Sequence, residues 1–187
     1  MGGFKALKKL SGIPLILHVV RKLKPFFGEL LIVTNHPSYL NLIKRDLKEI
    51  RIIKDEYLSS QTYKSSLVGI YTGLKNSSFS QSFIVACDMP FLNLDLINYL
   101  AGKMENFNAV LPKINGFIEP LHAIYAQECL VNFHEAALRA EFKICNVIKA
   151  LTVNYIKEKE IATFDPHCLS IFNINQPEDL EKAEKIL

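Results

Sequence analysis

The sequence predicts a single α/β domain of three layers (α/β/α), in which helices cover both faces of a mostly parallel central sheet. Short apolar runs typical of buried strands alternate with segments that carry apolar residues at helical spacing, which is the pattern of strand–helix–strand crossovers. A chain of 187 residues, 49% hydrophobic and 22% charged, is long enough to bury one substantial core. No linker, repeat or low-complexity tract divides residues 1–187, so we treat them as one domain.

The first part of the chain sets up the alternation. Residues 13–24 have apolar residues at helical spacing, with Pro14 near the start, where a missing amide is harmless, and Pro25 at the end. The run Glu-Leu-Leu-Ile-Val-Thr at 29–34 is typical of a short buried strand. The same criteria predict, in order, a helix over 38–48, a strand over 50–54, a helix over 66–75, a strand over 82–87, a helix over 94–103 and a strand over 109–112.

The later part is less regular. We expect strands over 119–126 and 152–156 and helices over 128–140 and 146–151. A last strand over 170–173 precedes a helix over 177–187. Pro177 stands in the first turn of that helix, where Glu178 and Asp179 favour its positive end.

Composition excludes several classes of function. The formal charge of +3 is too small and too dispersed for nucleic-acid binding. No apolar run reaches transmembrane length, and no signal-like region follows the Lys-rich first residues, so we expect a cytoplasmic protein that binds no membrane. The four cysteines, Cys87, Cys129, Cys145 and Cys168, are widely spaced without a Cys-x-x-Cys pair, which predicts reduced thiols rather than a zinc site.

Asp88 is the most prominent candidate for a functional residue. The apolar strand of residues 82–87 ends abruptly in this carboxylate, and Pro90 follows. Parallel sheets bind ligands just beyond the carboxyl ends of their strands. Mg²⁺ needs only one or two protein carboxylates, so Asp88 suits a Mg²⁺ site, and a turn aspartate that caps the next segment is the alternative.

A series of short motifs runs in order along nearly the whole chain: Met1-Gly2-Gly3-Phe4-Lys5-Ala6-Leu7, Leu10-x-Gly12-x-Pro14-Leu15-Ile16, Leu31 to Asn35, Ile53-Lys54-Asp55, Ser66 to Leu74, Ala86 to Phe91, Glu119 to Tyr125 and Phe172 to Leu180. Together these motifs resemble the molybdenum cofactor guanylyltransferase (molybdopterin-guanine dinucleotide biosynthesis protein A) family, within the MobA-like NTP transferase superfamily. The resemblance implies a Rossmann-like fold of the nucleotide-diphospho-sugar-transferase type. It also implies Mg²⁺-dependent transfer of GMP from GTP to molybdopterin, which releases pyrophosphate, and molybdenum-cofactor assembly proteins as partners.

The same resemblance assigns residues to the nucleotide side of the site. Lys5 corresponds to the lysine that grips triphosphate oxygens and acts with Asp88 in catalysis, although a solvated lysine beside Lys8 and Lys9 would look the same. The remaining residues implied to bind nucleotide are Gly2, Gly3, Asn35, Asp55, Ser66 and Leu67. An aspartate or asparagine after a strand is also common in plain turns, which is the alternative for Asp55 and Asn35.

Four residues are implied to bind the pterin substrate: Pro120, His122, Asn173 and Asn175. Asn173 and Asn175 would share one face of a strand. Capping of the helix at Pro177 explains Asn175 nearly as well, and a lone histidine in a strand is more often structural.

The sequence departs from the family pattern at its start. A doubly wound nucleotide domain normally opens with a strand and a glycine-rich turn. Here Phe4 stands where the pattern has Asp, Ser65 and Ser66 replace Gly-Pro, and the upstream Leu-Ala-Gly-Gly is not among residues 1–187. We therefore expect the first strand and the glycine-rich loop to be missing. A cytidylyl- or sugar-nucleotide transferase of the same fold, and an inactive binding protein that kept the fold, remain alternatives.

Overall fold

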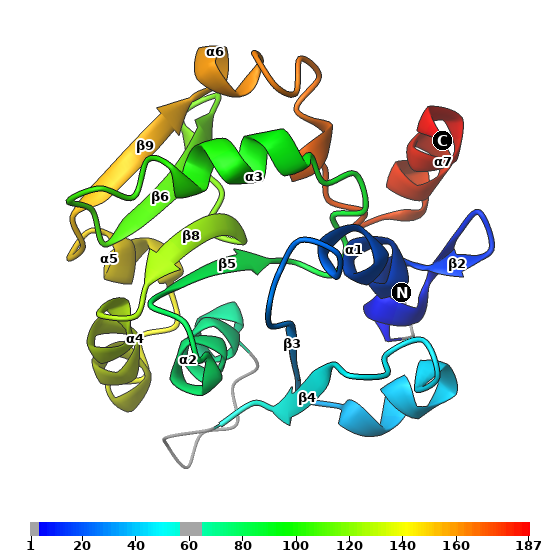
Figure 1. The fold of residues 1–187 in the computed structure, drawn as a ribbon, viewed down its shortest axis with the longest axis horizontal. Coiled ribbons are helices and arrows are strands. Elements are labelled where there is room, and N and C mark those ends of the chain that lie inside the picture. The colour runs from blue at the N-terminus through cyan, green and yellow to red at the C-terminus, as the bar shows by residue number, and fades with distance from the viewer. Residues whose placement is uncertain (1–3, 57–64) are drawn as a thin grey trace.

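Strands and helices alternate along the protein in the computed structural model, which describes residues 4–56 and 65–187 (Figure 1). The strands are β1 (Lys9–Leu10), β2 (Ile13–Pro14), β3 (Leu31–Thr34), β4 (Arg51–Lys54), β5 (Gln81–Val85), β6 (Ala109–Ile114), β7 (Phe117–Ile118), β8 (His122–Ala126) and β9 (Val153–Lys157). The α-helices are α1 (Leu15–Leu23), α2 (Ser66–Asn76), α3 (Leu94–Ala101), α4 (Cys129–Leu138), α5 (Ile144–Ile148), α6 (Glu158–Ile161) and α7 (Pro177–Ile186). Three 3-10 helices, η1 (Lys5–Leu7), η2 (Pro37–Ile43) and η3 (Leu169–Ile171), complete the elements.

The strands form a five-stranded sheet, a separate parallel pair and a short hairpin. In the large sheet the order is β5-β8-β6, and both β7 and β9 pair with β6. Because β8 is antiparallel to both of its neighbours, β5 and β6 run the same way, and β9 is parallel to β6. β3 and β4 form the parallel pair, in register from Leu31 with Arg51 to Thr34 with Lys54. Apart from β8 and the two-residue β7, the strands of the large sheet share one direction.

The large sheet has a helical layer on each face, as the alternating side chains of its strands show. Ala109 and Leu111 of β6 pack in a cluster with α2, α4 and α5, whereas Val110 between them packs with α3 and α6. β8 alternates in the same way. Figure 1 shows these two groups of helices on opposite sides of the sheet. The predicted three-layer α/β class is confirmed.

Two tight hairpins were not predicted, although their turns carry recognisable residues. Ser11 and Gly12 join β1 to β2 with φ of 48° and 78°, and Asn115 and Gly116 join β6 to β7 with φ of 49° and 82°. Two successive positive φ values give the turn whose twist matches paired strands, and Asn-Gly is its most favoured sequence. The strands β1, β2 and β7 beside these turns have two residues each, which is too short to show the alternation of apolar and polar residues that predicts a strand.

Two predicted elements are wrong. The segment 170–173 is not a strand, because the Asp165 carboxylate accepts hydrogen bonds from the amides of Leu169 (3.0 Å) and Ser170 (2.7 Å) and holds the chain in the 3-10 turn η3. The segment 38–48 forms η2 and a series of turns instead of an α-helix. Only Leu40 and Leu47 are buried there, so packing gives a regular helix little support.

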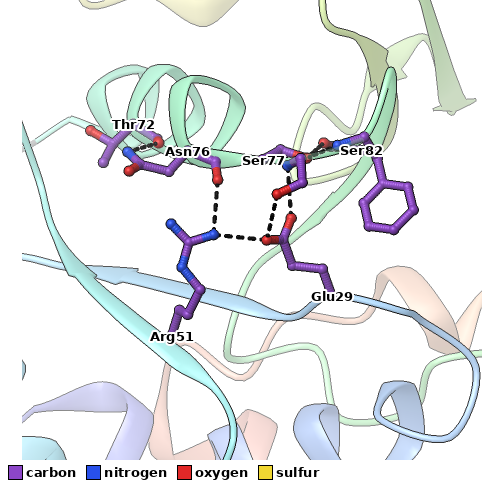
Figure 2. A network of polar contacts seen from close by, with 8 residues as sticks. Glu29, Arg51, Thr72, Asn76, Ser77 and Ser82 are labelled. Carbon is purple, nitrogen blue, oxygen red and sulfur yellow. Dashed lines mark hydrogen bonds and ion pairs between the residues drawn. The ribbon is translucent and has the colours of Figure 1, made fainter.

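The starts of β3, β4 and β5 are tied together by Glu29. Its carboxylate accepts hydrogen bonds from the Ser78 amide (2.9 Å) and hydroxyl (3.2 Å) and from Arg51 Nη1 (2.8 Å). The same Arg51 nitrogen donates to the carbonyl of Asn76 at the end of α2 (3.2 Å), and Figure 2 shows Arg51 and Glu29 facing each other beneath α2. The bond from the Ser78 amide is the main reason why the pKa of Glu29 is lowered. The starts of these three strands therefore lie at one end of the molecule.

Ser65 caps α2, as a hydroxyl in that place predicts. Its Oγ accepts a hydrogen bond from the amide of Leu67 at 3.2 Å. Replacing it with alanine leaves that amide unpaired, so we expect Ser65→Ala to lower the free energy of unfolding by about 1 kcal/mol. Chemical denaturation measures the change. Ser65→Thr, which keeps the hydroxyl, is expected to stay close to the parent; an equal loss in both variants would contradict the capping role.

Candidate active site

Three polar side chains from distant parts of the chain meet at one point. The Lys5 ammonium forms an ion pair with Asp88 Oδ2 and donates a hydrogen bond to Asn175 Oδ1 at 2.5 Å. The side chain of Asp88 is 9% exposed and that of Lys5 is 34% exposed, so Asp88 is nearly buried while Lys5 stays partly accessible to solvent. The structure thus brings together one cation and two oxygen acceptors, and Lys5 and Asn175 among them are 170 positions apart in the chain.

The turn after β5 fixes Asp88. The Ala86 amide donates a hydrogen bond to the Leu121 carbonyl (3.1 Å), and the Met89 amide donates one to the Ala86 carbonyl (3.4 Å). Met89 is completely buried, which anchors the turn on its inner side. The carbonyl of Asp88 accepts a hydrogen bond from the Ile174 amide at 3.0 Å, so the backbone next to Asn175 is joined directly to the backbone of Asp88.

The start of α7 fixes Asn175. The amides of Asn175 and Gln176 both donate to Asp179 Oδ2, at 3.0 and 2.9 Å, and Pro177 occupies the first turn. These two hydrogen bonds lower the pKa of Asp179, and the bond from the Gln176 amide has the larger effect. Asn175 therefore serves both alternatives weighed from the sequence: its backbone takes part in the helix start, while its side chain holds Lys5.

Glu119 is a site residue that the sequence reasoning did not single out. It precedes β8, and its Oε1 accepts the Leu121 amide at 3.0 Å. Burial is the main cause of its raised pKa; the negative charge of Asp88 raises it further, and a hydrogen bond with the Asn173 side chain lowers it. Glu119 was part of a motif, but only the fold brings it within electrostatic reach of Asp88. The Asn173 side chain thus contacts Glu119, whereas the Asn175 side chain contacts Lys5.

An apolar cavity of about 600 Å³ begins beside Asp88 and extends between β3 and β5. Ser66 and Gly69 of α2 and Cys87 are among the residues that line it. Burial, helped by the charge of Asp88, raises the pKa of the Cys87 thiol to about 11, so it stays protonated and is no nucleophile. The polar cluster therefore stands at the rim of an apolar space.

Among the other residues predicted for the nucleotide side, Ser66 lines the cavity, and Asp55 lies beside Gly69, which also lines it. Asp55 follows β4, and its amide donates to Thr34 at the end of β3 (3.3 Å). Its Oδ1 is buried without a hydrogen-bond partner among residues 4–56 and 65–187, and burial raises its pKa. Asn35 directly follows β3. The side chain of Leu67 is fully buried in the core, so only its backbone, in the first turn of α2, is left to contact a ligand. Gly2 and Gly3 lie outside the described residues.

Comparison with known protein families agrees with this geometry. The family described as "MobA-like NTP transferase domain" matches residues 1–153. The chain belongs to this family. Its strand-end aspartate and the lysine that pairs with it are therefore found in a nucleotidyltransferase fold, and the resemblance inferred from the motifs is confirmed.

Individual MobA-like relatives match almost the entire chain. A "Probable molybdenum cofactor guanylyltransferase" of Natranaerobius thermophilus is 35% identical over 100% of this chain and 90% of its own length. A "Molybdenum cofactor guanylyltransferase" of Desulfosudis oleivorans is 34% identical over 98% and 87%. The solved molybdopterin-guanine dinucleotide biosynthesis protein A of Archaeoglobus fulgidus is 30% identical, with a TM-score of 0.83 over 99% of this chain and 91% of that one.

The cluster of this MobA-like protein suits a divalent cation of the Mg²⁺ type. Asp88 Oδ2 and Asn175 Oδ1 already converge on one positive charge, the Lys5 ammonium. Mg²⁺ takes oxygen ligands, keeps several waters and needs few carboxylates. In the described part of the chain no group of three or more His, Cys, Asp or Glu side chains is placed to hold a metal ion. Asp88 would hold the ion.

Two of the residues predicted to bind the pterin, His122 and Pro120, have these surroundings in the structure. His122 is completely buried, and its ring packs edge-on against Phe83 with centroids 5.0 Å apart. The ring is therefore enclosed in the core, as the structural alternative for His122 expects. The carbonyl of Pro120 accepts a hydrogen bond from the Tyr125 hydroxyl at 2.9 Å, and this positions the neighbouring Glu119.

The buried His122 predicts a dependence of stability on pH. Neither ring nitrogen has a hydrogen-bond partner in the described residues, and burial lowers the pKa of His122 to about 4, against a weaker opposing effect of Asp165. Between pH 6.5 and 4 the unfolded chain binds a proton that the folded chain does not bind. The free energy of unfolding should therefore fall as pH falls through this window, by about 3 kcal/mol in total.

Urea unfolding of the parent and of His122→Leu at several pH values measures this effect. The leucine variant lacks the titrating ring, so its advantage over the parent should widen from pH 7 to pH 4 and change little above pH 7. Parallel stability curves for the two proteins would show that His122 is protonated equally in both states.

None of the helices formed by residues 4–56 and 65–187 combines the length and apolar character that a membrane span requires.

Proposed function

We propose that the protein transfers GMP from GTP to molybdopterin, which gives the guanine dinucleotide form of the cofactor and pyrophosphate. The observation that carries this proposal is the contact of Lys5 with both Asp88 and Asn175 in a chain of the MobA-like family. The names of the relatives from Natranaerobius thermophilus and Desulfosudis oleivorans support the choice of reaction. We treat residues 1–187 as one domain that performs it.

In this reaction a terminal phosphate oxygen of molybdopterin attacks the α-phosphorus of GTP. The bond from the α-phosphorus to the bridging oxygen breaks, and pyrophosphate leaves with that electron pair. No protein nucleophile is needed, so catalysis consists mainly of positioning and charge neutralisation. Mg²⁺, when bound, neutralises the charge that grows on the phosphate oxygens.

The side chains divide this work. Lys5 binds triphosphate oxygens as a mobile point charge, and Asn175 holds it in place before the nucleotide arrives. Asp88 supplies the carboxylate for Mg²⁺, and Glu119 adds negative charge beside it. Asp55, Asn35 and the backbone at Ser66 and Leu67 are proposed to bind nucleotide. Asn173, which is hydrogen-bonded to Glu119, and Pro120 are proposed to border the binding site of molybdopterin, the acceptor.

The cellular setting follows from the same proposal. All four cysteines, Cys87, Cys129, Cys145 and Cys168, are free thiols, which suits the reducing cytoplasm. The substrates are the small molecules GTP and molybdopterin, and the product would pass to molybdenum-cofactor assembly proteins.

A nucleotide competition experiment tests the reaction. The protein is incubated with Mg²⁺, molybdopterin and GTP, CTP or ATP, and the dinucleotide product and pyrophosphate are quantified alongside nucleotide affinity. We expect product from GTP and the tightest binding for GTP. Tighter binding of CTP would point to a cytidylyltransferase, and binding of GTP without pyrophosphate release would point to an inactive binding protein; each result would contradict the proposal.

A further inference from the structure

The helix α7 lies along the N-terminal segment of the chain. Figure 1 shows α7 beside the hairpin of β1 and β2, which leads from Lys5 to α1. Leu10 of β1 and Ala183 of α7 are completely buried in one small cluster, so the hairpin and the helix share an apolar contact. The N-terminal hairpin and the C-terminal helix are therefore packed against each other.

Glu184 adds a polar contact near the end of α7. Its Oε1 accepts a hydrogen bond from the Ser11 amide, and its Oε2 accepts one from the Ser11 hydroxyl, both at 2.6 Å. The bond from the hydroxyl, followed by that from the amide, lowers the pKa of Glu184, so the carboxylate stays ionised. Hydrogen bonds to an ionised acceptor are stronger than those between neutral groups. Glu184 thus holds Ser11 with both of its oxygens.

Ser11 occupies a position that needs support. With Gly12 it forms the turn of the hairpin, and its φ of 48° lies in the left-handed region that residues other than glycine seldom adopt. Such a backbone conformation persists where the surroundings hold it in place. The Glu184 carboxylate supplies two of the bonds that do so, one to the backbone and one to the side chain.

The opposite end of α7 contacts the candidate active site. Asn175, just before the helix, accepts the hydrogen bond from the Lys5 ammonium. The neighbouring Ile174 amide donates to the Asp88 carbonyl at 3.0 Å. The helix thus begins at the point where Lys5 meets Asp88, and it ends where Glu184 holds the hairpin.

The backbone between Lys5 and Ser11 is short and internally bonded. The Lys8 amide donates to the Lys5 carbonyl at 3.1 Å, and the Lys8 carbonyl accepts a bond from the Leu15 amide at 2.8 Å, across the hairpin. A movement of Ser11 is therefore passed on to Lys5, because little loose chain lies between them to absorb it.

We propose that Glu184 is a positioning residue for nucleotidyl transfer: by holding Ser11 against α7, it fixes the backbone that carries Lys5. This role rests on the proposed function, in which Lys5 binds the triphosphate. A lysine places its charge at the end of a flexible stem, so its aim depends on a fixed backbone. A displacement of about 1 Å at a reacting site can lower a rate by about 100-fold.

Glu184→Ala tests the proposal in the intact chain. We expect kcat/KM for GTP to fall about tenfold, because the segment that carries Lys5 is released at one end. Glu184→Gln should stay within about threefold of the parent, since its amide group can still accept from the Ser11 amide and donate to the hydroxyl. The control is Glu181→Ala, which removes an exposed glutamate from the same helix and should leave the rate unchanged.

A double-mutant cycle separates positioning of Lys5 from a general loss of stability. If Glu184 acts through Lys5, adding Glu184→Ala to Lys5→Met should change kcat/KM by less than about twofold, because no ammonium is left to position. The affinity for GTP should follow the same pattern. A general loss would instead lower both quantities by the same factor in the parent and in Lys5→Met.

Hydrogen exchange gives a readout that needs no turnover. We expect the amides of Lys8 and Ser11 to exchange at least about tenfold faster in Glu184→Ala than in the parent, whereas those of β6 and β9 should keep their rates. If the parent binds GTP but releases no pyrophosphate, the proposed reaction fails on its own, and exchange and GTP affinity still test the role of Glu184.

Three results would overturn the proposal. Additive losses in the double variant would show that Glu184 does not act through Lys5. Unchanged exchange at Lys8 and Ser11 would show that the hairpin is held without the carboxylate. Equal losses in Glu181→Ala and Glu184→Ala would make the effect one of charge on α7. If Glu184→Ala does not fold, Ser11→Ala replaces it; this variant removes one of the two bonds and should lower kcat/KM by about threefold, and no loss would again contradict the role.

Discussion

Asp88→Asn is expected to lower Mg²⁺-dependent formation of the guanine dinucleotide by at least about 100-fold while leaving the fold intact. The substitution keeps the size of the side chain but removes the charge that would hold the divalent ion. The stability cost should be small, because the ion-pair partner Lys5 is 34% exposed and the backbone bond from Ile174 to the Asp88 carbonyl is retained. Steady-state pyrophosphate release and circular dichroism measure the two effects.

The matched control is Asp95→Asn. Asp95 is an exposed aspartate in the first turn of α3, away from the cluster, and its loss should leave turnover unchanged. Turnover of Asp88→Asn within threefold of the parent, with the control also active, would refute the metal role of Asp88. Raising the Mg²⁺ concentration offers a second check, since a weakened ligand should be partly compensated by more metal.

Lys5→Met is expected to lower kcat/KM for GTP by about 100-fold, which is the effect of losing one preorganised donor to a developing phosphate charge. Methionine keeps most of the length and packing of the lysine stem, so the loss reports on the ammonium. The ion pair with Asp88 and the bond to Asn175 disappear together in this variant. Initial rates over a range of GTP concentrations give the measurement.

The control for Lys5 lies in the same segment. Lys9 in β1 is exposed, and Lys9→Met removes the same formal charge from the protein without touching the cluster. If Lys5→Met and Lys9→Met lower kcat/KM equally, the loss comes from the change in net charge, and a specific role of Lys5 in binding the triphosphate is refuted. Lys5→Arg should recover part of the activity, because a guanidinium keeps the charge but not the compact shape of an ammonium.

The order and class of the elements could be predicted because the core is periodic. The strands β5 and β6 were predicted from continuous apolar runs, which is how buried parallel strands appear. The helices α2 and α7 were predicted from helical spacing, with a start signal at Pro177 for α7. Where a segment is held by side chains rather than by its own periodicity, prediction failed. The Asp165 carboxylate that bends residues 169 and 170 into η3 leaves no local pattern.

The candidate site was predictable in part for the same reason. Asp88 stands at the end of a strand, so its place at the ligand-binding edge followed from topology. Lys5 contacts both Asp88 and Asn175, which lie far apart in sequence, and only the motif resemblance put these residues in one set. Glu119 was missed because its relation to Asp88 depends on how β8 is inserted between β5 and β6.

The ion pair of Lys5 with Asp88 links two binding events that could otherwise be independent. A divalent ion that takes Asp88 must displace the lysine, and a triphosphate offers the displaced ammonium a new partner. Each ligand therefore lowers the cost of binding the other, and by reciprocity the gain is the same in both directions. We expect metal titrated alone to bind weakly and its apparent Kd to fall when GTP is present, so the protein would engage the metal–nucleotide complex as one unit.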